Sequence, residues 1–76
     1  MNFEIAPKST EKEYNWYDAR LYCFALTIDG KSGWRLPTYE EFRTDSRILG
    51  WYQECESWPI DLKTNLLFVY PVRNLT

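Results

Sequence analysis

The fold of this chain is decided by one stretch, Gly33-Trp34-Arg35-Leu36-Pro37-Thr38-Tyr39-Glu40-Glu41-Phe42. Gly33 permits a turn that a side chain would hinder, and Pro37 fixes its own φ while keeping the preceding residue out of helical space. Thr38 with Glu41 three residues later is typical of a capping box, so a helix should begin directly after Thr38. The stretch therefore predicts a turn, a buried Trp34, a rigid entry and a capped helix.

Two helices are expected. The capped one covers residues 39–48. An earlier helix covers residues 16–28, because Asn15 is typical of a helix cap and apolar residues at helical spacing follow it. Gly30 is expected to end this helix in the left-handed conformation.

Two strands complete the expected fold. Alternating polar and apolar residues predict a strand over residues 2–6, and a continuous apolar run predicts a central strand, buried on both faces, over residues 66–72. Pro71 lacks an amide donor, so pairing should be interrupted there or confined to one side. Residues 8–13 should be a polar connection and residues 61–65 a turn. The sequence thus predicts an α+β fold in which two helices pack on a small antiparallel sheet of paired N- and C-terminal strands.

Composition places residues 1–76 in a single small domain. Four Trp, six Tyr and four Phe, 18% of the chain, supply large apolar area and argue against disorder. The net charge of −2 and the scattered Lys and Arg provide no basic patch for nucleic acid. No apolar run approaches the ~20 residues that span a membrane, and the first five residues lack the features of a signal peptide, so a cytoplasmic location is expected.

The chain has no histidine, which excludes the usual metal triads and the Cys-His and Ser-His-Asp arrangements. Cys23 lies on the apolar stripe of the first helix and is expected to be a buried thiol. Cys55 lies between two glutamates, which would raise its pKa rather than activate it. We therefore expect no enzyme activity, no cofactor and no metal. Two thiols or one disulfide remain open.

Two further sets of charged residues have a structural and a functional interpretation. Arg35 between core-bound neighbours is expected to bridge the second helix and the core rather than to bind a ligand. Glu54, Glu56 and Asp61 match no cation-binding loop and are interpreted as a solvated acidic edge.

Residues along most of the chain resemble a known pattern. They are Trp16-x-x-Ala19-x-x-Tyr22-Cys23-x-x-Leu26, Gly33-Trp34-Arg35-Leu36-Pro37-Thr38, Glu41-Phe42 and Tyr70-Pro71-Val72-Arg73. In them the chain resembles a widespread bacterial and phage domain family of unknown function, marked by a Trp-Arg-Leu-Pro-Thr motif. That family is related to the C-type-lectin-like fold of formylglycine-generating, sulfatase-modifying enzymes. The resemblance implies a minimal C-type-lectin-like scaffold with shortened loops.

The expected binding surface lies in the irregular segment of residues 50–60. Its candidate residues are Trp51, Tyr52, Trp58, Glu54 and Glu56. Three aromatic rings in a short irregular stretch exceed what a small core easily absorbs, and exposed rings are typical anchors of protein interfaces. The carboxylates would select a basic partner. Core packing is the alternative for each ring.

These observations predict a small non-enzymatic module that binds another protein. Nucleic acid, membranes and small-molecule ligands are not expected as partners. The resemblance adds that the chain is a phage-encoded or accessory modulator of a host protein. The alternative is a glycan-binding structural component of the virion, tail or adhesin type. A catalytic or redox fragment is least favoured, because histidine is missing.

Overall fold

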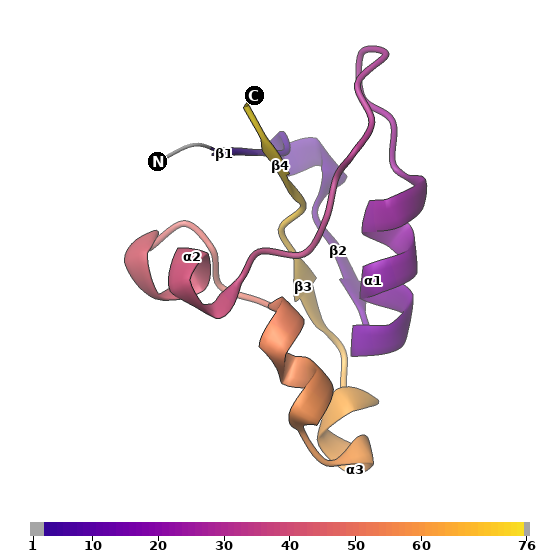
Figure 1. Ribbon diagram of the computed structural model, residues 1–76. Coiled ribbons are helices and arrows are strands. Elements are labelled where there is room, and N and C mark those ends of the chain that lie inside the picture. Colours follow the sequence, from indigo (N-terminus) through magenta and orange to yellow (C-terminus); the bar gives the residue numbers. More distant parts are fainter. Residues whose placement is uncertain (1–2, 76) are drawn as a thin grey trace.

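Short strands from the two ends of the chain lie side by side in the computed structural model, which describes residues 3–75 (Figure 1). The fold is α+β, with three short α-helices and two small antiparallel sheets. The elements in chain order are β1 (Phe3–Ile5), the 3-10 helix η1 (Lys8–Thr10), β2 (Lys12–Tyr14), α1 (Trp16–Ala25), α2 (Tyr39–Thr44), the 3-10 helix η2 (Gln53–Ser57), α3 (Ile60–Lys63), β3 (Leu67–Val69) and β4 (Val72–Asn74).

The predicted C-terminal strand is present but is broken in two. β4 pairs antiparallel with β1, with Ile5 opposite Val72, and β3 pairs antiparallel with β2, with Tyr14 opposite Leu67. The break falls at Pro71, as expected for a residue without an amide donor. The predicted pairing with the N-terminal strand is therefore confirmed only through β4. Residue 2, which the prediction included, lies outside the described residues.

Two elements were not expected. Residues 8–13, predicted as a polar connection, contain η1 and most of β2. β2 carries few apolar residues, so its strand form comes from pairing with β3 rather than from a pattern of its own. Residues 61–65, predicted as a turn, contain most of the short helix α3.

The other edge of the β3–β4 segment is paired as well. Arg35 and Val72 exchange two backbone hydrogen bonds of 2.8 Å, and the N–H of Trp51 donates to the carbonyl of Phe68 at 3.2 Å. A Cβ atom on Gly50 would collide with the same Phe68 carbonyl oxygen, so glycine is required there for close backbone approach. The segment is therefore central, as predicted.

The prediction that both faces of this segment are buried is wrong for its first half. Leu67 and Phe68 of β3 are exposed, while Val69 is completely buried. Consecutive strand residues point to opposite faces, so both faces of β3 are partly open at Leu67 and Phe68.

Helix α1 begins at Trp16, as predicted, because the Asn15 side chain accepts a hydrogen bond of 2.9 Å from the N–H of Asp18. It ends at Ala25, three residues before the predicted end. Leu26 already has extended backbone angles.

The Asp29-Gly30 pair forms a hairpin turn instead of a helix end. Both residues have positive φ, 51° and 77°, and two hydrogen bonds between Ile28 and Lys31 close the turn. Positive φ at both central positions is the geometry that Asp-Gly favours in two-residue hairpins. Asp29-Gly30 therefore makes a hairpin turn rather than the end of a helix.

Helix α2 begins after Thr38 with the predicted capping box. The Thr38 hydroxyl accepts from the N–H of Glu41 at 3.1 Å, and Glu41 Oε1 accepts from the N–H of Thr38 at 2.9 Å. The helix ends at Thr44 rather than at residue 48. Asp45 ends it, because its carboxylate accepts a hydrogen bond from the N–H of Arg47 and so forms a local turn.

Arg35 bridges α2 and the sheet, as predicted. Its guanidinium makes a two-pronged ion pair with Glu41, at 2.8 and 2.9 Å, and donates to Asn74 Oδ1 at 2.7 Å. The Arg35 hydrogen bonds hold the pKa of Glu41 below its usual value, and the backbone of Thr38 adds to this effect. The ion pair thus fastens the first turn of α2 to the C-terminal strand.

Two apolar clusters hold the fold together. The first comprises Trp16, Ala19, Cys23, Leu36, Trp51, Cys55 and Val69, and the second comprises Ile48, Tyr70 and Val72. α1 contributes to the first cluster, and Phe42 of α2 packs against the second. The two helices lie on opposite sides of the C-terminal segment in Figure 1. Trp34 is buried, as predicted.

Candidate functional site

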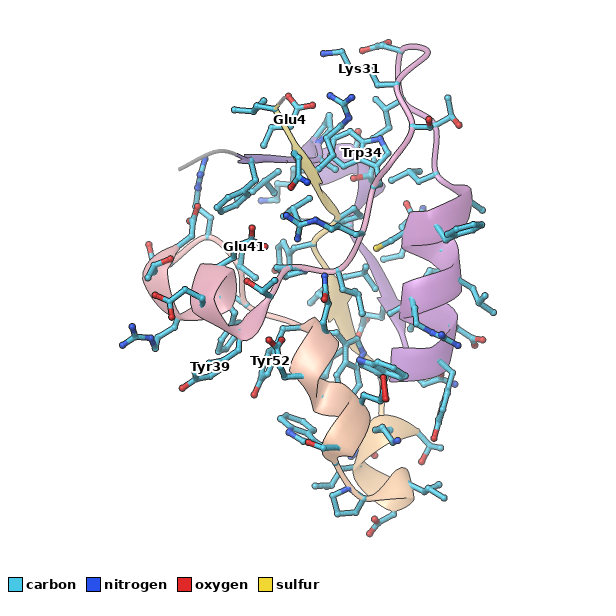
Figure 2. All side chains as sticks on the ribbon, in the orientation of Figure 1. Glu4, Lys31, Trp34, Tyr39, Glu41 and Tyr52 are labelled. Atoms are coloured by element: carbon cyan, nitrogen blue, oxygen red, sulfur yellow. The ribbon has the colours of Figure 1, made fainter. Side chains whose placement is uncertain are left out.

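Four aromatic side chains meet where α2 approaches η2. We call Tyr39, Phe42, Tyr52 and Trp58 the aromatic surface. The Tyr52 ring is central: its centroid lies 4.7 Å from Phe42, 5.4 Å from Tyr39 and 5.9 Å from Trp58. Figure 2 shows Tyr39 and Tyr52 next to each other at this junction. Tyr39 is 46% exposed, and the other three rings are half-buried.

The backbone of η2 places two of these rings. Tyr52 precedes η2 and Trp58 follows it, and their rings meet edge to face across the helix. The indole N–H of Trp16 donates to the carbonyl of Tyr52 at 3.1 Å, which anchors the start of η2 to α1. The backbone N–H of Gln53 donates to the carbonyl of Pro37 at 2.9 Å. The surface is therefore held to the core on two sides.

Trp51 does not belong to the exposed surface, and its prediction as a binding residue is corrected. Its side chain is completely buried in the first cluster, and its indole N–H donates to the carbonyl of Tyr14 at 2.7 Å. The rings of Trp51 and Trp58 meet edge to face at 5.8 Å. Trp51 is thus the support on which Trp58 rests. Core packing, the alternative named for each ring, applies to Trp51.

Glu54 and Glu56 are exposed, and Glu54 is hydrogen-bonded to the aromatic surface. Glu54 Oε1 accepts a hydrogen bond of 2.8 Å from the N–H of Tyr39, which joins η2 to the first turn of α2. Both glutamates border a shallow depression together with Gln53 and Ser57. Glu56 also borders a hollow beside α1. An acidic rim is present, and it extends away from the rings toward α1.

Two residues of the surface, Tyr39 and Phe42, were not expected there. From the sequence, Tyr39 was expected only to begin the second helix. Their spacing of three residues on a helix was a usable signal, because residues at i and i+3 lie on one helix face. What the spacing could not show is that Tyr52, from a distant segment, packs against this pair.

Burial keeps the two thiols of the chain and the Tyr52 hydroxyl in their neutral forms at neutral pH. Burial raises the pKa of Cys23 to about 12, and burial also raises the pKa values of Cys55 and Tyr52. Both cysteines are buried free thiols, so the alternative of a disulfide does not apply. A buried thiol with a raised pKa is a poor nucleophile.

Within residues 3–75, no group of three or more His, Cys, Asp or Glu side chains is arranged to hold a metal ion. In the same part of the chain, no helix combines the length and apolar character needed to cross a membrane. Comparison of the chain with models of protein families, with curated proteins and with solved structures finds no match.

Proposed function

We propose that the protein is a non-enzymatic binding module whose aromatic surface engages a basic segment of another protein. The observation that carries this proposal is the cluster of contacting rings around Tyr52, with Tyr39 exposed and a carboxylate, Glu54, directly beside it. Aromatic rings supply large contact area at low entropic cost, and they are enriched among the residues that dominate binding energy.

Charge complementarity decides the class of partner. Glu54 accepts the Tyr39 N–H through one oxygen only, and Glu40 on α2 is largely exposed in its weak pair with Arg43. An arginine or lysine of the partner would stack on the rings of Tyr39 or Tyr52 while its charge meets Glu54. A basic segment is therefore the occupant that this surface favours.

The proposal includes a C-type-lectin-like scaffold and a role as an accessory or phage-encoded modulator of a host protein. Both rest on the resemblance of the motif residues. Support comes from the pairing of β1 with β4 and from the burial of Trp16 and Trp34, two aromatic residues of the motif.

Selection from a displayed library of random twelve-residue peptides tests the proposal. Peptides enriched on the parent protein should carry Arg or Lys. Tyr52→Ala should weaken their binding at least about thirtyfold, since truncating an interface anchor usually costs at least ~2 kcal/mol. The parallel variant Glu54→Gln keeps an acceptor for the Tyr39 N–H but removes the charge, and it should weaken binding less and reduce the dependence on salt.

Leu66→Ala is the matched control, because Leu66 is exposed and lies outside the aromatic surface. It should leave both the melting temperature and peptide binding unchanged. The proposal is refuted if no enriched peptide carrying Arg or Lys binds Tyr52→Ala more weakly than the parent. A glycan array signal that Tyr52→Ala removes, without any enriched peptide, would replace it with the glycan-binding alternative.

A further inference from the structure

The extended segment of Trp34, Arg35 and Leu36 is a strand edge. Both backbone groups of Arg35 are hydrogen-bonded to Val72, and β1 pairs with the opposite edge of β4. Successive residues of a strand direct their N–H and C=O groups to opposite edges. The backbone groups of Trp34 and Leu36 therefore point away from β4.

Three of these outward backbone groups are unpaired. Among residues 3–75, the N–H and C=O of Trp34 and the N–H of Leu36 have no hydrogen-bond partner. Trp34 and Leu36 are largely buried as whole residues, and both line the hollow described next. Unpaired N–H and C=O groups along a strand edge can pair with the backbone of another segment. The fourth group, the Leu36 C=O, accepts from the Gln53 side chain at 2.8 Å, which closes the edge at that end.

An apolar hollow runs beside this edge. Its volume is about 240 Å³, and α1 forms its opposite wall. The residues that line it are Trp16, Arg20 and Phe24 from α1, Trp34, Arg35 and Leu36 from the edge, and Gln53 and Glu56. Phe24 is 84% exposed, so its ring stands at the rim without covering it.

We propose that the edge and the hollow form a strand-addition site for an extended apolar segment of a partner protein. The segment pairs with the unpaired backbone groups of Trp34 and Leu36 and inserts one large apolar side chain between the edge and α1. Strand addition of this kind takes its affinity from main-chain hydrogen bonds and its specificity from side-chain pockets. The site is separate from the aromatic surface and goes beyond the function proposed for it.

The chemistry of the hollow selects this occupant. Donors and acceptors that alternate at strand spacing match a peptide backbone. Three charged residues line the hollow. Arg35 is paired with Glu41, and Arg20 and Glu56 have opposite signs. The Arg20 guanidinium lies 5.4 Å from the centre of the Trp16 ring. The floor consists of buried apolar side chains, so an uncharged, apolar segment fits better than an acidic or basic one.

The test starts from a displayed library of random twelve-residue peptides, selected on the parent protein and counter-selected on Phe24→Glu. Because Phe24 is exposed, this variant should melt at the parent temperature. Enriched peptides should carry a large apolar residue and bind Phe24→Glu at least about tenfold more weakly. They should bind Tyr52→Ala as tightly as the parent, which separates this site from the aromatic surface.

Hydrogen exchange then identifies the pairing. With an enriched synthetic peptide bound, the amide of Leu36 should exchange at least about tenfold more slowly, while the amide of Arg35, already bonded to Val72, should change little. N-methylation of the peptide should weaken binding about tenfold at the residues that face the edge. Methylation of the residues between them should have little effect.

Several results would overturn the proposal. They are the absence of any enriched peptide, equal binding to Phe24→Glu, an unchanged Leu36 amide, and sensitivity to N-methylation without an alternating pattern. A dimer in sedimentation that Phe24→Glu dissociates would show that a second copy of the chain occupies the edge, and would overturn the choice of partner.

Discussion

Residues 33–42 and residues 50–64 both present aromatic rings beside acidic side chains, but partners at very different distances along the chain hold them. In the first segment, the Trp34 indole donates to the carbonyl of Lys31, and Thr38 caps the helix with Glu41. Each of these partners is three residues away. The Trp34 ring and the start of α2 are thus set by immediate neighbours, while distant partners, Val72 and Asn74, hold only Arg35 of this stretch to the C-terminal strand.

The second segment is held from afar. The Trp51 indole donates to the carbonyl of Tyr14, 37 residues earlier, and the Gln53 side chain reaches Leu36, 17 residues earlier. Lys63 is buried, with its Nζ close to the rings of Trp16 and Tyr17 of α1.

The aromatic surface forms only when residues 33–42 and residues 50–64 pack against each other. Tyr39 and Phe42 come from the locally shaped segment, and Tyr52 and Trp58 come from the one held by distant partners. Variants that loosen residues 50–64 should therefore abolish the surface even where α2 keeps its helix.

The largest effect is expected for Trp51→Ala. Its side chain is completely buried, so truncation should cost about 3–5 kcal/mol, enough to unfold much of so small a domain. Urea denaturation measures this. Trp58→Ala is the matched control, because the Trp58 ring is only half-buried beside the same cluster, and it should cost clearly less. A Trp51→Ala variant as stable as Trp58→Ala would break the distinction between supporting and surface rings.

The next largest loss of stability is expected for Gly50→Ala, which should lower the free energy of unfolding by about 3 kcal/mol. The added Cβ collides with the Phe68 carbonyl and pushes residues 50–64 away from β3. Gly33→Ala provides the comparison in the other segment. Its Cβ meets no atom within 4 Å, and only the positive φ of 84° opposes it, so about 1 kcal/mol is expected. Thermal melts of both variants give the ranking. A reversed order would mean that local conformation, not docking, limits stability.

The smallest loss of stability is expected for Glu41→Gln, which should lower the free energy of unfolding by about 1 kcal/mol at pH 7. The ion pair with Arg35 is lost, while an acceptor for the Thr38 N–H remains. The folded-state pKa of Glu41 lies below its ordinary value of 4.5. Its contribution is therefore fully present above about pH 4.5 and is lost as the pH falls through the folded pKa. Melting temperatures between pH 2 and 7 should converge for parent and variant at the acid end. A constant difference would contradict the assignment.

The parts that could be predicted from the sequence are those governed by contacts within a few residues. Asn15 and Thr38 start helices where they were expected to, and Pro71 interrupts the strand. Helix ends were predicted too late because Asp45 competes for the backbone locally, and because Asp29-Gly30 serves equally well as a hairpin turn.

Which of the candidate site residues are buried could not be predicted from the sequence. Trp51, Tyr52 and Trp58 lie in one irregular segment, and neither helical nor strand periodicity assigns any of them to the inside. Trp51 alone is completely buried, because Tyr14 supplies a carbonyl for its indole N–H, and that residue reaches it only after β2 pairs with β3.

Local chemistry thus determined the caps, the turns, the break at Pro71 and the ion pair of Arg35 with Glu41. The tertiary structure decided which rings became core, which became surface, and that Trp34 and Leu36 line an apolar hollow beside α1. The physical reason is range: a cap or a turn is complete within about four residues. Burial and strand pairing depend on residues that approach each other only when the whole chain folds.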